Sequence, residues 1–293
     1  MLTSNIEEYD INININISEK QTIVVNLSKK TGCLTIIDNF NQKTGKSKSL
    51  IYLRIDGEFN QPIILPDSLR ELDIYGVFNQ PIILPDSLKD LQIKGIYNQL
   101  IILPENLKVL EIYGKYNQPI ILPNSMRELY IDGEFNNSII LPDSIITLQI
   151  SGKFNQPIIL PDSLETLRIE SDFNKPITLP DSITDLIING SFNQPIILPN
   201  NLSDFILEGE FNQSITLPNS IEHLVIRDNF NKSIILPEYL VVLDIDGVFN
   251  QPIILPNSLK TLYINEIYNQ KLILPEHINY INLIGEYIIL ERI

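Results

Sequence analysis

The sequence predicts an all-β repeat fold, a solenoid of 19-residue turns with one stacked parallel sheet and little or no helix. The eleven residues FNQPIILPDSL occur three times without change, beginning at Phe59, Phe78 and Phe154. Phe-Asn or Tyr-Asn recurs every 19 residues, and a fixed period of this size is typical of solenoids. Most of the repeats close with Leu-x-x-Leu-x-Ile, whose final alternation predicts one short strand per turn.

Thirteen repeats stand in register over 40–286, and each is numbered from its aromatic residue as position 1. Residues 1–39 are a predicted N-terminal β cap that includes the Ile-Asn alternation of 11–17. Residues 287–293, beginning at Tyr287, are a predicted C-terminal cap. Caps are expected because the open edge of a parallel sheet invites aggregation. The thirteen aromatic residues are Phe40, Phe59, Phe78, Tyr97, Tyr116, Phe135, Phe154, Phe173, Phe192, Phe211, Phe230, Phe249 and Tyr268.

Three positions predict the corners of each turn. Position 2 is Asn in all 13 repeats, and stacked amides at a fixed turn predict an asparagine ladder from Asn41 to Asn269. Position 8 is Pro in 12 repeats, and proline cannot donate to a strand ladder, so it belongs at a corner. Position 18 is Gly in 10 repeats and predicts a second corner. The three repeats without this Gly carry Ser171, Asp228 and Glu266.

The core is predicted from the positions that are apolar in most repeats, namely 1, 5, 7, 11, 14 and 16. One repeat alone cannot close this core, so the turns are expected to bury it by stacking. Position 6 is usually Ile, but Thr178 and Thr216 replace it, so this column is expected to point outward. In the N-terminal cap, Leu27, Leu34 and Ile36 fall at positions 7, 14 and 16 of the same frame.

The composition excludes several classes of protein. A hydrophobic content of 44% supports a large core and excludes disorder. The formal net charge of -15 argues against nucleic acid and anionic membranes as partners. No run approaches the roughly 18 apolar residues of a membrane span, and the N-terminus lacks the pattern of a signal peptide. These features, with a single cysteine, predict a cytoplasmic protein.

The residues that carry metal or nucleophilic chemistry are few and far apart. Cys33 lies between apolar residues in TGCLTII and is interpreted as a core thiol. His223 and His277 lie far along the array, so neither a cysteine–histidine nucleophile nor a metal site is predicted. No cofactor and no catalytic residue is assigned.

The repeated stretch resembles the FNIP repeat. The resemblance covers 40–286 and rests on Phe/Tyr-Asn, Pro at position 4 in 7 of 13 repeats, Ile-Ile-Leu-Pro, and Leu-x-x-Leu-x-Ile. FNIP repeats are abundant in amoebae and in the giant DNA viruses that infect them, which implies the host cytoplasm if the chain is viral. The family implies a fold like a leucine-rich repeat, here with a tighter 19-residue period and with Asn at position 2 in place of the usual signature Asn.

Some relatives in this family carry an N-terminal F-box, a helical module that docks onto ubiquitin-ligase scaffolds, and their repeats are held to select the substrate. The 39 residues before the repeats here show Ile alternation and no helical period. The resemblance therefore implies a non-enzymatic protein–protein interaction scaffold whose protein partner is not indicated. The substrate-recognition part of an F-box-type ubiquitin-ligase system is the alternative.

The variable positions 13, 15 and 17 form the predicted outer face of the sheet, because they face away from the buried positions 14 and 16. Solenoids commonly bind partners on such a face. Ile187, Ile206 and Val225 occupy position 15 of three successive repeats and predict an apolar strip for partner contact. Exposed aromatic residues of the kind that anchor interfaces are predicted on the same face. They are Tyr75, Tyr113, Tyr130 and Tyr263.

Two further interpretations involve other residues. The outward Ile column at position 6 either packs against another copy, giving a self-assembling structural protein, or is buried against corner residues. An enzyme similar to the glycan-cleaving β-helices would use carboxylates of adjacent turns and is disfavoured, because no long loop forms a cleft. The column begins with Ile64, Ile83, Ile102, Ile121 and Ile140, and the carboxylates are Asp73, Asp185, Asp204, Asp244 and Asp246.

Overall fold

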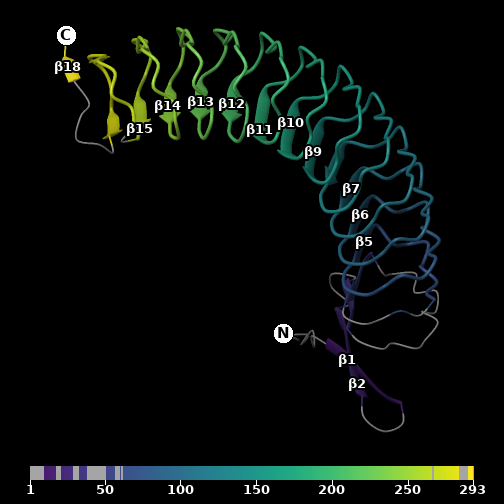
Figure 1. Ribbon diagram of the computed structural model, residues 1–293. Coiled ribbons are helices and arrows are strands. Elements are labelled where there is room, and N and C mark those ends of the chain that lie inside the picture. Colours follow the sequence, from purple (N-terminus) through teal and green to yellow (C-terminus); the bar gives the residue numbers. More distant parts are fainter. Residues whose placement is uncertain are drawn as a thin grey trace, which may run out of the picture. The chain divides into compact units, whose positions relative to one another are not determined.

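The chain folds into turns of β-strand and extended return segments (Figure 1). The strands within the described residues account for all regular elements there, in agreement with the all-β prediction. Within the same residues no helix is long and apolar enough to cross a bilayer. The computed structural model describes residues 10–17, 21–28, 33–37, 51–56, 60, 62–265, 267–283 and 290–292.

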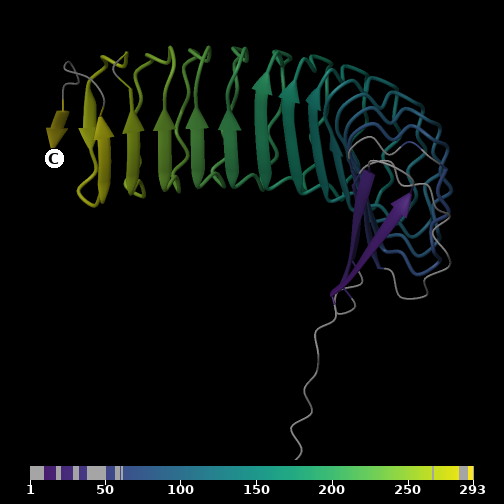
Figure 2. The same ribbon diagram turned by 90° about the horizontal axis from the view of Figure 1, so that it is seen from below.

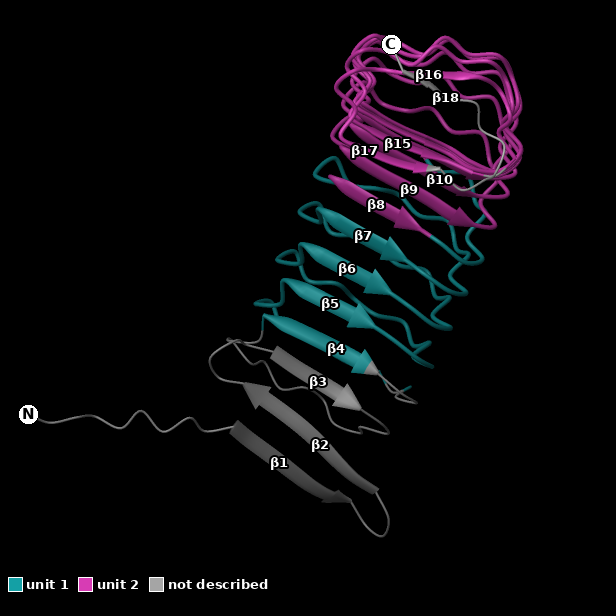
Figure 3. Cartoon of the chain, turned by 90° about the vertical axis from the view of Figure 1, so that its left-hand side faces the viewer, with its two compact units in different colours: residues 1–126, 132–139 teal, residues 127–131, 140–293 magenta. Residues whose placement is uncertain are grey.

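Two compact units make up the chain (Figure 3). Unit 1 comprises residues 1–126 and 132–139, and unit 2 comprises residues 127–131 and 140–293. Several predicted features lie outside the described residues. They are the aromatic residues Phe40, Phe59 and Tyr287, the first ladder residue Asn41, the corner residue Glu266 and the side chain of Cys33.

Unit 1 contains strands β1 to β7 of a sheet. β1 and β2 pair antiparallel, as do β2 and β3, whereas the neighbours from β3 to β7 are parallel. The strands are β1 (Asp10–Ile17), β2 (Gln21–Ser28), β3 (Cys33–Ile37), β4 (Tyr52–Asp56), β5 (Glu71–Ile74), β6 (Asp90–Ile93) and β7 (Val109–Ile112).

Unit 2 contains a parallel sheet of β8 to β15 and β17, whose strands lie side by side and point the same way (Figure 2). β16 and β18 form a separate parallel pair in the return segments. The strands are β8 (Glu128–Ile131), β9 (Thr147–Gly152), β10 (Thr166–Ser171), β11 (Asp185–Gly190), β12 (Asp204–Leu207), β13 (His223–Ile226), β14 (Val242–Ile245), β15 (Thr261–Ile264), β16 (Leu272–Leu274), β17 (Tyr280–Leu283) and β18 (Leu290–Arg292).

The 19-residue period sets the register of the sheets. Parallel neighbours pair residues one period apart, as in Leu72 opposite Leu91 and Leu186 opposite Phe205. A slip of one residue would exchange the buried and exposed faces of a strand. The constant spacing therefore keeps positions 14 and 16 in the core and positions 13 and 15 on the outer face, as predicted.

Position 8 opens the first corner of each turn. The carbonyl oxygen of Pro85 accepts a hydrogen bond from the Leu88 N–H at 3.1 Å, and the same bond recurs in the other repeats from Pro66 to Pro256. This bond closes a four-residue β-turn, which confirms the corner role of the proline. Ser87 at position 10 adds a bond between turns, because its Oγ donates to the Leu69 carbonyl oxygen at 2.6 Å.

Position 18 forms the second corner, where glycine is required for two reasons. Gly95 has a left-handed backbone, with a φ of 106°. A Cβ added to it would lie 2.2 Å from the carbonyl oxygen of Gly76 in the preceding turn, so both the backbone conformation and the close approach exclude a side chain.

Two of the residues that replace this glycine, Asp228 and Ser171, form the corner with different backbone conformations and hydrogen bonds. Asp228 keeps a left-handed φ of 54°, and its carboxylate accepts a hydrogen bond from the Gly209 N–H at 2.8 Å. Ser171 instead ends strand β10 and is buried, and its Oγ accepts a hydrogen bond from the Phe173 N–H at 3.1 Å. The left-handed corner is thus preferred but not obligatory, as predicted from the sequence.

A column of stacked aromatic rings fills the core of each unit. The ring centroids of Phe78 and Tyr97 lie 5.9 Å apart with 4° between the ring planes, and those of Phe192 and Phe211 lie 6.1 Å apart. These rings are fully buried among the apolar residues of positions 5, 7, 11, 14 and 16. Each offset stack contributes roughly 0.5–1.5 kcal/mol beyond the burial of apolar area.

Two successive rings of unit 1 carry a buried hydroxyl group. The hydroxyl oxygens of Tyr97 and Tyr116 have no hydrogen-bond partner among the described residues. Desolvation raises the pKa of Tyr97 to about 12, and it also raises the pKa of Tyr116. The hydroxyl groups therefore oppose folding at positions where Phe fits without this cost.

The asparagines at position 2 bond one turn to the next. The Oδ1 atom of Asn174 accepts a hydrogen bond from the Asn193 N–H at 3.0 Å, and the Oδ1 atom of Asn193 accepts one from the Asn212 N–H at 3.0 Å. Gln213 adds a second donor to Asn193, also at 3.0 Å. The side chain thus binds the backbone of the following turn.

The N-terminal strands depart from the predicted frame in one respect. Leu34 lies opposite Leu53 and Ile36 opposite Ile55, so β3 follows the repeat frame as predicted. Leu27, in contrast, lies opposite Leu34 in the antiparallel pair of β2 and β3. The prediction that Leu27 occupies a return position is wrong, because β2 pairs along its whole length with β1 and belongs to the sheet.

The C-terminal strand also leaves the frame. Leu290 of β18 lies opposite Leu272 of β16, one residue short of the repeat period. The sequence places Tyr287 in register with the 19-residue period, and this predicts that the C-terminal cap keeps the repeat frame. At β18 the pairing is shifted by one residue from that frame.

Replacing Asn193 with Ala should lower the free energy of unfolding by about 1–3 kcal/mol, because the partly buried Asn212 N–H loses its acceptor. Chemical denaturation measures this change. Asn200→Ala, at an exposed turn, is the control and should stay within about 0.5 kcal/mol of the native chain. An unchanged unfolding midpoint in Asn193→Ala would remove the ladder from the account of stability.

Replacing both Tyr97 and Tyr116 with Phe should raise the free energy of unfolding by roughly 1–3 kcal/mol at neutral pH, because no unpaired hydroxyl is then buried. The gain should increase from pH 10 to about 12. Over that range the tyrosines of the unfolded chain ionise while the raised pKa keeps Tyr97 neutral in the fold, so the native chain loses stability.

Thermal unfolding of the native chain and of the double Tyr→Phe variant, between neutral and alkaline pH, measures this difference in stability. Phe135→Tyr is the matched control and should lower stability, because it adds a buried hydroxyl to the same column. Equal stability of the double variant and the native chain throughout the pH range would contradict the prediction.

Candidate functional site

An apolar strip crosses three neighbouring strands of unit 2 on the outer face of the sheet. Ile187 on β11 lies opposite Ile206 on β12, which lies opposite Val225 on β13. All three side chains are partly exposed, because position 15 points away from the core. Arg168 of β10 and Asp244 of β14 occupy the same position at the two ends of the strip. The three residues are therefore contiguous in the structure.

Polar residues border the strip on the side of position 13. The Nδ1 atom of His223 lies 2.6 Å from the Oδ1 atom of Asp204, and the two side chains are 49% and 42% exposed. Asp185 lies opposite Asp204 and accepts a hydrogen bond from the Thr184 hydroxyl at 2.9 Å. This edge of the strip is acidic and open to solvent.

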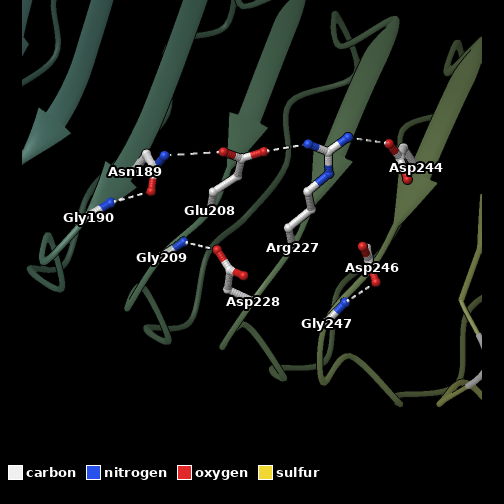
Figure 4. A network of polar contacts seen from close by, with 9 residues as sticks. All are labelled: Asn189, Gly190, Glu208, Gly209, Arg227, Asp228, Asp244, Asp246 and Gly247. Atoms are coloured by element: carbon white, nitrogen blue, oxygen red, sulfur yellow. Dashed lines mark hydrogen bonds and ion pairs between the residues drawn. The ribbon is translucent and has the colours of Figure 1, made fainter.

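An ion-pair network borders the strip on the side of position 17 (Figure 4). The Nη1 atom of Arg227 lies 2.8 Å from Glu208 Oε1, and its Nη2 atom lies 2.8 Å from Asp244 Oδ2. Asn189 donates to the other oxygen of Glu208 at 3.3 Å. The hydrogen bond to Asp244 and the charges of both carboxylates raise the pKa of Arg227. One guanidinium group thus connects three successive turns beside the strip.

Asp246 extends this edge toward the glycine corner. It accepts hydrogen bonds from the Gly247 N–H at 2.7 Å and from Asn265 Nδ2 at 2.8 Å. These bonds lower the pKa of Asp246, so the group is a carboxylate at neutral pH. The apolar strip therefore has charged groups on both sides, which is the usual arrangement of an apolar interface centre and its polar rim.

Aromatic residues on the sheet face of unit 1 are covered by cations. Lys94 Nζ lies 5.2 Å from the ring centre of Tyr75 and 4.6 Å from that of Tyr113, and the Arg54 guanidinium lies 4.0 Å above Tyr75. Tyr75 also donates a hydrogen bond to Gln92. Both tyrosines are partly exposed, as the residues of the strip are, and side chains of neighbouring turns cover part of their rings.

The other two predicted tyrosines lie in unit 2. Tyr130 is also partly exposed, and its hydroxyl donates to Glu128 Oε2 at 2.8 Å. Tyr263 on β15 is 36% exposed, and its ring centroid lies 5.4 Å from that of Tyr280. Asp244 separates Tyr263 from Val225 along position 15, so Tyr263 lies near the strip without extending it.

The carboxylates considered for catalysis have local partners. Asp73 accepts a hydrogen bond from the Tyr52 hydroxyl at 2.6 Å and lines a shallow acidic hollow of about 260 Å³ in unit 1. Asp204 is hydrogen-bonded to His223, and Asp244 forms an ion pair with Arg227. Within the described residues, no group of three His, Cys, Asp or Glu side chains is placed to hold a metal ion.

The return side presents a different, apolar face. Position 6 is 89% exposed in Ile83 and Ile102 of unit 1, and 90% in Ile197 and Ile254 of unit 2. Its outward direction is confirmed. The alternative that the column is buried against corner residues is wrong, because positions 5 and 7 take the inward direction in the extended segment.

A groove of about 710 Å³ lies on this return side of unit 2. Tyr239, Ile254 and Ile273 contribute apolar walls, and Glu238 and Lys271 contribute charges. This groove was not predicted from the sequence. Its signal is Tyr239, an aromatic residue at position 10, where the other described repeats carry Ser, Asn or His.

Comparison of the sequence with known families identifies the repeats. The profile of the FNIP Repeat matches residues 59–95, 97–134, 135–172, 173–208 and 211–247, which is more than half of the chain. The chain belongs to the FNIP repeat family. A search of curated proteins finds no match.

Solved structures similar to this FNIP repeat protein have leucine-rich repeats. YopM from Yersinia enterocolitica WA-314 matches with a TM-score of 0.59 at 22% identity, over 84% of this chain and 64% of that chain. CroV588, described as a novel circular LRR protein, has a TM-score of 0.43 at 28% identity, over 87% and 58%. A leucine-rich repeat protein from Eubacterium ventriosum ATCC 27560 has a TM-score of 0.29 at 13% identity, over 90% and 91%.

The match to YopM shows the leucine-rich-repeat-like fold that the sequence predicts. The chain spans less than two thirds of the length of CroV588 and of YopM. Repeat solenoids of this type are typical of protein-interaction scaffolds.

Replacing Arg227 with Gln should lower the free energy of unfolding by less than about 1 kcal/mol in low salt, because the guanidinium is 45% exposed and solvent screens its ion pairs. The loss should shrink further in roughly 1 M salt. Thermal unfolding at both salt concentrations measures it. Arg168→Gln on β10, outside the network, is the control, and a salt-independent loss in Arg227→Gln would contradict the ion-pair account.

Proposed function

We propose that this FNIP repeat protein is a non-enzymatic protein–protein interaction scaffold that binds its partner on the outer sheet face of unit 2. The observation that carries the proposal is the strip of Ile187, Ile206 and Val225, in register on adjacent strands. Single apolar residues on a surface are ordinary, whereas contiguous ones mark interaction sites. Tyr263 is a further contact in this proposal, since it is exposed on the same face.

The rim of the strip defines the chemistry of the proposed partner. Asp185, Asp204 and Glu208 lie beside the strip, and Arg227 is paired with carboxylates on both sides. A protein segment with an apolar anchor flanked by basic groups complements this surface. The net charge of -15 disfavours nucleic acid, and the single cysteine suits action in the reducing cytoplasm.

Two other functions are considered for the same chain. As the substrate-recognition part of an F-box-type ubiquitin-ligase system, the protein would use the same sheet face to select a substrate. Self-association is a second candidate, favoured by the apolar residues of position 6, which are 88% exposed in Ile235 and 90% in Ile254.

Replacing Ile187, Ile206 and Val225 together with Ser should reduce partner capture at least tenfold, because the apolar centre of the interface is lost. The measurement is a tagged pull-down from native host cells, compared quantitatively by mass spectrometry between the native chain and the variant. The melting temperature of the variant should stay close to that of the native chain, since these side chains are only partly buried.

The matched control replaces Ile83, Ile102 and Ile121 with Ser, which removes three exposed isoleucines from the return side of unit 1. Capture should survive in this control. Equal capture by the native chain and the strip variant would show that the strip is not the interface. Capture of ubiquitin-ligase scaffold subunits by the native chain, and their retention by the strip variant, would favour the ubiquitin-ligase alternative.

A further inference from the structure

We propose that two copies of the chain pair through the return face of unit 2, in antiparallel orientation, with the two-fold axis at Ile197. The inference rests on the self-association proposed above and adds its register and its centre. Five apolar side chains of position 6 carry it, each 88–90% exposed. They are Ile140, Ile159, Ile197, Ile235 and Ile254.

On the side of position 4, the surface next to this column is free of charge over these repeats. Position 4 is the neighbouring outward column and carries Pro or Ser from Pro157 to Pro252, until Lys271 brings the first charge. A partner that covers positions 4 and 6 therefore displaces water mainly from apolar and neutral groups, and it meets charge at the edge, where Asp162 lies near Ile159 and where Glu238 and Lys271 line the groove. Exposed apolar surface of this extent marks an interaction site.

The order of residues along the column is the same in both directions. From Ile140 to Ile254, position 6 is Ile, Ile, Thr, Ile, Thr, Ile, Ile, with Ile197 in the middle. In a two-fold interface residue i of one copy contacts residue j of the other, and j contacts i. An antiparallel pair centred on Ile197 thus sets Thr178 opposite Thr216 of the second copy, and Ile159 opposite Ile235.

The groove distinguishes the antiparallel orientation from a parallel one. In the antiparallel pair, Ile140 of the second copy approaches Ile254 and enters the groove of about 710 Å³ beside Tyr239. In a parallel pair the groove of one copy would face the groove of the other, and both hollows would stay unfilled. Filling a hollow with an apolar side chain is favourable, because close packing restores dispersion contacts.

The size of the surface predicts a weak pair. Six intervals of about 4.8 Å make the column about 30 Å long, and positions 4 to 8 span about 15 Å. Each copy therefore contributes on the order of 450 Å², below the roughly 800 Å² per partner of stable complexes. We expect a dimer that forms at micromolar or higher protein concentrations.

Sedimentation equilibrium of the full chain, over roughly 1 to 500 µM, tests the pairing. The native chain should change from monomer to dimer, and Ile159→Ser with Ile235→Ser should weaken dimerisation at least tenfold. Ile83→Ser with Ile102→Ser in unit 1 is the control, since these residues are equally exposed, and it should leave the dimer unchanged. A native chain that stays monomeric overturns the proposal, while strip-dependent partner capture would stand independently.

Disulfide trapping tests the register. Chains carrying Ile159→Cys, mixed with chains carrying Ile235→Cys, should form a cross-linked heterodimer, whereas Ile159→Cys alone should not cross-link. The native chain supplies the background from Cys33. If Ile159→Cys chains cross-link with each other and the mixture yields no cross-linked heterodimer, the antiparallel register is overturned while self-association is kept.

Discussion

Contact between one turn and the next, at a spacing set by the 19-residue period, is the constraint on which the rest of each unit depends. The sheet, the asparagine bonds, the serine bonds and the aromatic stack all recur between one turn and the next. At the glycine corner the two backbones approach so closely that no side chain fits between them. A single inserted residue would disturb all of these contacts at once, which explains why the period does not vary.

The same constraint separates two surfaces of different character. On the sheet side, positions 13, 15 and 17 are free to vary, and in unit 2 they hold an apolar strip between charged edges. On the return side, position 6 is nearly always Ile, with Thr178 and Thr216 as exceptions in unit 2. A variable face suits recognition of another protein, and a uniform apolar face suits a second copy of the same surface. The two proposals therefore use different residues and do not compete.

Most of the fold could be predicted because each structural role is repeated at a fixed position. Proline turns, left-handed glycines and the outward direction of position 6 follow from the chemistry of one residue type in one place. The antiparallel placement of Leu27 could not be predicted, because it depends on pairing with β1 and not on the repeat frame. For the candidate site, periodicity brought Ile187, Ile206 and Val225 together, but it could not show that Lys94 covers Tyr75 and Tyr113. That arrangement depends on side-chain packing between neighbouring turns.

The asparagine bond has a consequence for how such a chain can change its length. Asn193 receives from the turn that follows it the same hydrogen bond that Asn174 receives from the turn of Asn193, so equivalent turns present interchangeable surfaces. A gene duplication or deletion that adds or removes one whole repeat therefore joins compatible backbones at the seam. The identical copies at Phe59, Phe78 and Phe154 are what such copying leaves behind. Evolution can in this way lengthen the outer sheet face by whole turns and then diversify the residues at positions 13, 15 and 17, without disturbing the hydrogen bonds that hold the turns together.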